Sequence, residues 1–239
     1  MLKICRYFFA FLYLIFITGF VGLLISLIRP FNTNNVWSTT HLIGHPMRII
    51  MGLKYVGRGI ENIEASKPCV YISNHQNTID IISGSIHLPR RTVSLGKSTI
   101  VWVPIFGLFY WLSGNILINR SDKKKVKESM SKVTNVIRNK NTSVWIMPEG
   151  TRNLGKGLLP FKTGAFKTAI NAGVPIVPIC FNTYARTADY NKWSAGTIAC
   201  QVLKPIPTVA LTNSDANKLA KQCFDMMNKA INDLDQEFT

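Results

Sequence analysis

A histidine and an aspartate five positions apart, His75 and Asp80, could carry out acid–base chemistry. They follow an apolar run, residues 69–72, that is typical of a buried strand, and the polar pair Ser73–Asn74 marks its end. Where a strand turns into a helix, the carboxylate can hold the imidazole in one tautomer, which leaves the other ring nitrogen free to take a proton. Because no serine or cysteine nucleophile stands beside the pair, that proton would come from a substrate hydroxyl. The arrangement suits acyl transfer to an alcohol, although the same spacing also fits a histidine that only bridges a turn.

Three further clusters stand at expected strand ends. Gly114–Arg120 is an apolar strand that delivers an arginine to its end, and Met147–Arg152 again follows a strand-like run. Val174–Pro178 is an apolar block with two prolines, and Leu159–Phe166 lies between the last two clusters. Ligands of an α/β domain gather at the carboxyl ends of its strands, so these clusters stand where such a domain binds its substrate.

Four of these blocks, taken in order, resemble the glycerolipid acyltransferase family, and within it the bacterial 1-acyl-glycerol-3-phosphate acyltransferases. The blocks are His75–Asp80, Gly114–Arg120, Met147–Arg152 and Val174–Pro178. Its hallmark is a His-x4-Asp block, a Gly…Arg block, a Glu-Gly-Thr-Arg block and a proline-bearing apolar block. The resemblance covers residues 53–239 and the apolar N-terminus. Many members carry aspartate before the arginine of the second block, where this chain has Asn119, so the resemblance implies no carboxylate role there.

The resemblance implies a catalytic pair and a phosphate site. His75 is the general base for the free hydroxyl of lysophosphatidic acid, and Asp80 orients it and stabilises its imidazolium form. Arg152 is the first choice for the glycerol phosphate, because a guanidinium binds phosphate through two hydrogen bonds and keeps its charge. Arg120 is the second choice, and Lys97, after the strand-like run 92–96, is the third.

Three neighbours of Arg152 are expected to support the site. Gly150 allows a tight turn and Thr151 offers a hydroxyl. Glu149 either positions an arginine or a hydroxyl group or has a purely structural role. The segment Lys162–Gly164 starts a helix whose free amides favour an anion, or it simply caps that helix.

The implied reaction moves a fatty acyl group from a thioester to 1-acyl-glycerol 3-phosphate and forms phosphatidic acid in phospholipid biosynthesis. The implied donor is acyl-CoA or acyl-carrier protein. No metal or redox cofactor is expected, because His41, His45 and His87 lack partners at ligand spacing. Two alternatives stay open: the same chemistry on glycerol 3-phosphate or another lysophospholipid, and a non-catalytic protein that binds anionic lipid or nucleic acid.

Charge favours a membrane surface as the partner. The chain has 28 Lys and Arg against 12 Asp and Glu, a formal net charge of +16, and its first acidic residue is Glu61. A cationic and apolar N-terminal quarter is typical of proteins at anionic membranes and unusual for nucleic-acid binding domains, so no nucleic-acid partner is expected. The five cysteines are scattered without a C-x-x-C pair, which indicates buried, reduced thiols in a cytoplasmic domain.

The uncharged stretch Tyr7–Ile28 is long and apolar enough for a membrane helix. A second helix over Val36–Leu53 could return from it. Such a hairpin, dipping into one leaflet, would keep its cations on one anionic face: Lys3, Arg6, Arg48 and Lys54. A single span is the alternative. In either arrangement the resemblance places the enzyme at the cytoplasmic face of the bacterial inner membrane.

The remaining pattern predicts an α/β fold, a layered sheet with flanking helices behind the membrane-embedded segment. We expect residues 1–52 to form that segment and residues 53–239 the acyltransferase domain. Strands are expected near 53–57, 69–73, 92–96, 115–119, 143–147, 174–181 and 197–203, and helices over 122–139 and from 214 onward. For the apolar run Val101–Leu112 we expect core packing, with a membrane-interface belt or the wall of an acyl-chain groove as alternatives.

Overall fold

The computed structural model describes residues 1–63, 68–119 and 123–238. Within these ranges the chain forms a seven-stranded sheet in the order β1-β7-β6-β2-β5-β3-β4. The strands are β1 Leu53–Arg58, β2 Val70–Ser73, β3 Thr92–Lys97, β4 Ile116–Ile118, β5 Ser143–Ile146, β6 Ile176–Phe181 and β7 Gly196–Val202. All seven predicted strands are present, with small shifts at their ends, and the predicted α/β class is confirmed.

The direction of the strands places one edge of the sheet at the functional blocks. Neighbouring strands pair in parallel except β6 and β7, which are antiparallel. The carboxyl ends of β2, β3, β4, β5 and β6 therefore share an edge, and those of β1 and β7 lie at the opposite edge. β2 and β6 are buried along their whole length, as parallel strands covered on both faces usually are.

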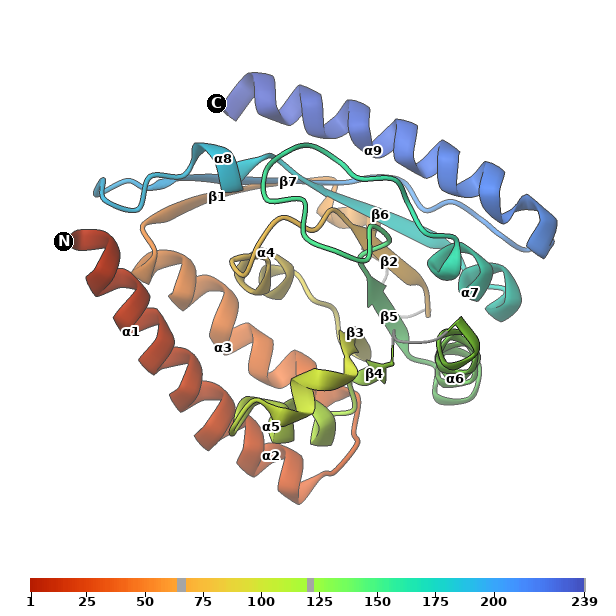
Figure 1. The fold of residues 1–239 in the computed structure, drawn as a ribbon, viewed down its shortest axis with the longest axis horizontal. Helices are drawn as coiled ribbons and strands as arrows, with labels where there is room; N and C mark the ends of the chain where they lie inside the picture. Colours follow the sequence, from red (N-terminus) through yellow and green to blue (C-terminus); the bar gives the residue numbers. More distant parts are fainter. Residues whose placement is uncertain (64–67, 120–122, 239) are drawn as a thin grey trace.

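Helices cover both faces of the sheet (Figure 1). α7 and α9 pack on one face, with α6 beside α7, and α3 and α4 lie on the other face. Their bounds are α3 Asn34–Ile50, α4 Asp80–Ile86, α6 Lys123–Lys140, α7 Gly164–Ala172 and α9 Ala216–Phe238. The shorter helical segments are η2 Ile60–Asn62, η3 Ser98–Trp102, α5 Phe106–Leu112, α8 Tyr184–Thr187 and η4 Asn213–Asp215.

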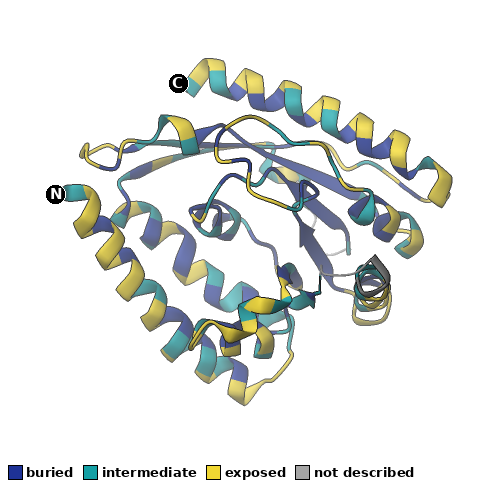
Figure 2. Ribbon diagram, viewed as in Figure 1, coloured by how far each residue is buried: buried dark blue, intermediate teal, exposed yellow. Residues whose placement is uncertain are grey.

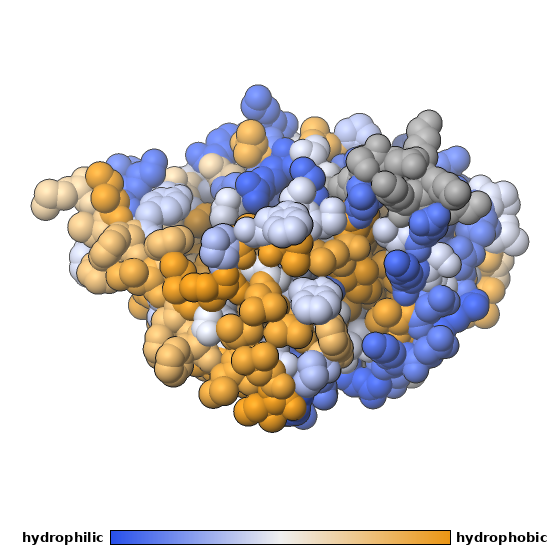
Figure 3. All heavy atoms as spheres, turned by 60° about the horizontal axis from the view of Figure 1, so that its bottom comes forward, coloured by the Kyte–Doolittle hydropathy of each residue, from blue (hydrophilic) through white to orange (hydrophobic). Residues whose placement is uncertain are grey.

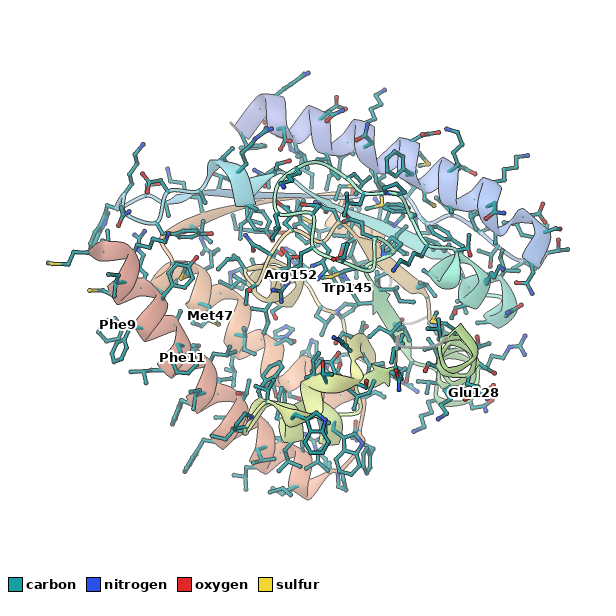
Figure 4. All side chains as sticks on the ribbon, viewed as in Figure 1. Phe9, Phe11, Met47, Glu128, Trp145 and Arg152 are labelled. Carbon is teal, nitrogen blue, oxygen red and sulfur yellow. The ribbon has the colours of Figure 1, made fainter. Side chains whose placement is uncertain are left out.

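The N-terminus is one long apolar helix. It comprises α1 Leu2–Phe16, a π-helical turn η1 Ile17–Gly22 and α2 Leu23–Ile28. It has 27 residues and contains an 18-residue stretch with a mean hydropathy of 2.6, enough by length and composition to cross a membrane. α3 returns alongside it, so the predicted helical hairpin is present. Phe9 and Phe11 project away from the α/β domain, whereas Met47 of α3 lies on the inner side (Figure 4).

Arg6 joins this apolar helix to the α/β domain. Its guanidinium donates hydrogen bonds to three backbone oxygens, those of Tyr190 (3.1 Å), Lys192 (2.8 Å) and Trp193 (2.6 Å). Gly52 has a φ of 69°, and any side chain there would collide with that guanidinium. The prediction that Arg6 faces an anionic surface is therefore wrong: the side chain is buried, and these oxygens accept hydrogen bonds from three of its five N–H groups.

The apolar run Val101–Leu112 is not simply core, and that prediction is also wrong. Phe109 and Tyr110 are buried, but Trp102 is 83% exposed, and exposed residues recur along the run (Figure 2). The reason is that α5 packs on η3, α2 and η1, while Leu108 and Trp111 on another side of this helix stay exposed.

The cysteines are free thiols, as predicted, and all but one are buried. Burial raises the pKa of Cys180, and it raises the pKa of Cys200 and Cys223 to about 12, so these thiols stay neutral. Cys5 is exposed on α1, which corrects the prediction of burial for that residue.

Candidate active site

The structure brings His75 and Asp80 into direct contact. His75 lies two residues beyond the end of β2, and Asp80 is the first residue of α4. The distance between His75 Nδ1 and Asp80 Oδ2 is 2.5 Å. A carboxylate oxygen only accepts, so Nδ1 carries the proton and Nε2 carries the lone pair. The imidazole side chain is 23% exposed, and no residue that the structure describes is hydrogen-bonded to Nε2.

Asp80 is held in place by hydrogen-bond donors on both of its oxygens. Oδ2 also accepts hydrogen bonds from the backbone N–H groups of Gln76 (2.7 Å) and Asn77 (3.2 Å). Oδ1 accepts from the phenol of Tyr184 on α8. Burial and the nearby Asp80 charge raise the pKa of Tyr184 well above its ordinary value, so the phenol remains a donor. These bonds fix the carboxylate that orients the imidazole.

Glu149 fastens the loop after β5 to the end of β2. The carboxylate is buried and accepts hydrogen bonds from the backbone N–H groups of His75 (2.5 Å) and Leu159 (3.0 Å) and from the amide of Asn153 (3.2 Å). The backbone N–H of Asn153 donates to the carbonyl of His75 (2.8 Å). Burial raises the pKa of Glu149, although its three donors act in the opposite direction. Of the two roles left open for Glu149, this geometry favours the structural one.

Glu149→Gln should destabilise the fold. Glutamine offers one oxygen and one NH2 group, so at least one of the three donors would face another donor, at a cost of roughly 1–3 kcal/mol in the free energy of unfolding. Denaturant unfolding of the full chain measures this. The matched control is Glu128→Gln, on the exposed side of α6 (Figure 4), which should leave the midpoint unchanged. Equal midpoints for the two variants would show that the three bonds do not stabilise the loop.

Gly150, Thr151 and Arg152 form the turn that follows. Gly150 has a φ of 71°, and a Cβ there would lie 2.7 Å from the ammonium nitrogen of Lys162, so glycine lets that side chain cross the turn. Thr151 and Arg152 are exposed (Figure 4 shows Arg152). Lys162 itself precedes α7, which begins at Gly164 as the sequence predicted. Lys162 therefore lies against the turn that carries Arg152, and the sequence analysis did not propose this lysine as a phosphate ligand.

Lys97 and Arg120 are the other two predicted phosphate ligands, and the structure describes only Lys97. Lys97 is exposed at the carboxyl end of β3, which pairs with β5, so it stands on the same edge as Arg152. Arg120 lies outside the described residues. The order of neighbouring strands β2, β5 and β3 thus lines up His75, Arg152 and Lys97 along one edge.

Several residues that support the site escaped the sequence analysis. Asn74 exchanges two hydrogen bonds with the backbone of Phe181, both 2.9 Å, and so clamps the end of β2 to the end of β6. The Gln76 side chain bonds the carbonyl of Asn182 (2.8 Å) and the backbone N–H of Ala185 (3.1 Å). The only local signal was that these polar side chains flank strand ends.

The His75 side chain reaches solvent, since it is 23% exposed. Two surface hollows, of about 340 and 490 Å³, lie along α9, and His75 lines neither of them. Within residues 1–63, 68–119 and 123–238, no three His, Cys, Asp or Glu side chains are grouped as a metal site would require.

Comparison with known proteins shows the family of this chain. The sequence model of the Acyltransferase family matches residues 55–182, and the chain belongs to this family. The chain is 39% identical to 1-acyl-sn-glycerol-3-phosphate acyltransferase of Haemophilus influenzae, over 99% of this chain and 98% of that protein. It is 37% identical to the Escherichia coli protein of the same name, over 99% and 96%.

A solved structure has the same fold. The crystal structure of the 1-acyl-sn-glycerophosphate (LPA) acyltransferase PlsC from Thermotoga maritima superposes with a TM-score of 0.75. The match covers 98% of this chain and 94% of that one at 18% sequence identity. The arrangement of sheet, flanking helices and N-terminal helices is therefore shared.

Proposed function

We propose that this protein is a 1-acyl-glycerol-3-phosphate acyltransferase, which transfers a fatty acyl group from a thioester to lysophosphatidic acid and forms phosphatidic acid. The observation that carries the proposal is the contact between His75 and Asp80, which leaves Nε2 unpartnered among the described residues, on the edge that holds Arg152. The choice of acceptor is supported by relatives that match over nearly their whole length.

In the mechanism, His75 Nε2 takes the proton of the acceptor hydroxyl as its oxygen attacks the carbonyl carbon of the thioester. Asp80, 2.5 Å from Nδ1, stabilises the imidazolium that forms. The bond between carbon and sulfur then breaks, the electron pair leaves with the sulfur, and the imidazolium returns the proton to that sulfur. The products are phosphatidic acid and a free thiol, and no acyl-enzyme is needed.

The acceptor phosphate binds to the cations on the same edge. Arg152 contributes two parallel donors, and Lys97 and Lys162 contribute point charges. Arg120 remains the second predicted ligand. The three supporting residues shape the turn that carries Arg152: Glu149 fastens its loop to the end of β2, Gly150 allows the turn, and Thr151 offers an exposed hydroxyl beside Arg152.

The apolar N-terminal helix is a candidate membrane anchor. We place the enzyme at the cytoplasmic face of the bacterial inner membrane, with the hairpin of Leu2–Ile28 and α3 in one leaflet. There lysophosphatidic acid arrives from the lipid, and acyl-CoA or acyl-carrier protein arrives from the cytoplasm. Both donors are anionic, and the net charge of +16 attracts them.

The test is an assay of the purified full chain in phospholipid vesicles with each donor. We expect phosphatidic acid from lysophosphatidic acid, and little acylation of glycerol 3-phosphate or of lysophospholipids with other headgroups. Preferred acylation of one of these acceptors would reassign the substrate but keep the chemistry. No thioester-dependent acylation of any acceptor would refute the proposal.

Arg152→Ala should mainly weaken acceptor binding. Loss of a charge-assisted pair of hydrogen bonds should raise the KM for lysophosphatidic acid roughly 10–100-fold while kcat changes less. The control is Arg58→Ala, because Arg58 is exposed at the opposite edge of the sheet and pairs with Glu237. An unchanged KM in Arg152→Ala would move the phosphate site elsewhere.

A further inference from the structure

A second apolar surface lies outside the N-terminal helix. It is made of six exposed side chains between the end of η3 and the end of α5, which we name the α5 surface: Val101, Trp102, Val103, Ile105, Leu108 and Trp111. Between Lys97 and Arg120 the sequence has no charged residue. Soluble proteins rarely leave contiguous apolar surface uncovered, so this one needs an occupant.

We propose that the α5 surface is a second membrane-embedded element, which enters the lipid beside the N-terminal helix. This inference rests on the proposed function, since it assumes an acceptor that lies in the same leaflet.

Close packing fixes α5 to the N-terminal helix. A Cβ at Gly19 would lie 2.6 Å from Ile105, and one at Gly22 would lie 2.6 Å from Phe109, so these glycines let the two elements touch. At the far end, the Phe31 ring meets Trp111 edge-on at 5.1 Å between ring centroids. The α5 surface therefore stays beside the apolar helix in one rigid arrangement.

The exposed sides of the two elements are continuous. Figure 3 shows one apolar expanse over the part of the molecule that α1, α2 and α5 form, with hydrophilic residues beyond it. A medium that covers the exposed phenylalanines of α1 would also cover Trp102 and Leu108. For a helix with the composition of Leu2–Ile28, that medium is lipid.

Residue types and charge also favour a bilayer over a protein partner. Trp102 and Trp111 are of the type that gathers at membrane interfaces. Arg29, after α2, and Lys97, before η3, are exposed cations that flank the apolar expanse in sequence and would meet anionic headgroups. Because η3 starts directly after Lys97, insertion of the α5 surface would bring the proposed phosphate site to headgroup level.

The chain supplies a matched pair of fluorophores to test this. Trp102 is 83% exposed, and Trp193 is 85% exposed on a loop whose neighbours Lys192 and Ser194 are polar and exposed. That loop contacts the start of the apolar helix, at Arg6, whereas α5 contacts η1 and α2 farther along it. The full chain is reconstituted in vesicles of phosphatidylcholine and phosphatidylglycerol, with or without lipids brominated on their acyl chains. The difference in emission between the wild-type chain and Trp102→Phe gives the contribution of Trp102. The difference between the wild-type chain and Trp193→Phe gives that of Trp193.

We expect brominated lipid to quench roughly half or more of the Trp102 emission and little of the Trp193 emission, because a lipid-embedded ring meets the bromines. Aqueous acrylamide should show the opposite preference. The proposal is overturned if acrylamide quenches Trp102 as fully as Trp193 and brominated lipid does not quench it. This measurement requires no turnover, so it decides the membrane contact even if the proposed reaction fails.

A kinetic comparison links the surface to catalysis. Trp102→Gln should raise the KM for long-chain lysophosphatidic acid in vesicles roughly tenfold, because an apolar contact with the leaflet is lost. The KM for a short-chain acceptor dissolved in water should not change, and Trp193→Gln should alter neither. An unchanged KM for the vesicle acceptor in Trp102→Gln would overturn a role of the surface in substrate capture.

Discussion

His75→Ala should reduce kcat by about 10²–10⁴-fold, the usual contribution of a positioned general base. The variant keeps the backbone bond from residue 75 to Glu149 and the bond from Asn153 to the carbonyl of residue 75. It loses only the imidazole, so the fold and the membrane association should persist. The KM for the acceptor should change little, because His75 is not among the proposed phosphate ligands.

Turnover is measured as phosphatidic acid formed in vesicles, with the thermal unfolding midpoint recorded alongside. The control is His45→Ala, which removes an exposed histidine of α3. If kcat in His75→Ala stays within about twofold of wild type, the fall in kcat is far smaller than the contribution of a general base. That result would exclude His75 from the role.

Asp80→Asn should reduce kcat by roughly 10²–10³-fold, as loss of a group that stabilises developing charge does. The asparagine oxygen can replace Oδ2 and still accept from His75 Nδ1 and from the backbone N–H groups of Gln76 and Asn77. The new NH2 group would face the Tyr184 phenol, which can accept from it and turn its own proton toward Ser83, 3.2 Å away. The tautomer is therefore preserved, and only the charge that stabilises the imidazolium is lost.

Asp80→Asn therefore separates electrostatics from geometry. We expect the unfolding midpoint to stay close to that of wild type while kcat falls. Asp225→Asn on the exposed side of α9 is the matched control, since Asp225 forms an exposed ion pair with Lys221 of the same helix. If Asp80→Asn unfolds at a much lower temperature, its lost activity reflects structure, and the proposed stabilisation of the imidazolium loses its support.

The strands and the catalytic pair could be predicted because their signals are local. Strand periodicity and the order of strands and helices can be recognised from consecutive residues. His75 and Asp80 are only five positions apart, so a single turn of the chain brings them together. The roles of His75, Asp80 and Arg152 remain predictions until the variants are measured.

Long-range contacts could not be predicted in the same way. Tyr184 meets Asp80 across 104 positions, and Glu149 meets the backbone of His75 across 74. No spacing rule connects such residues, because the sheet order brings β2, β5 and β6 together. The burial of Arg6 has the same origin, since its acceptors lie 184 to 187 positions away.

The sequence by itself determined the α/β class, the apolar N-terminal helix and the histidine–aspartate block, because each depends on neighbouring residues and their hydrophobic period. Only the tertiary structure decided how Asp80 is held, that Glu149 joins two loops and that the α5 surface is exposed. Hydrophobicity tells which residues avoid water, but the packing of distant elements decides which of them another part of the chain can cover.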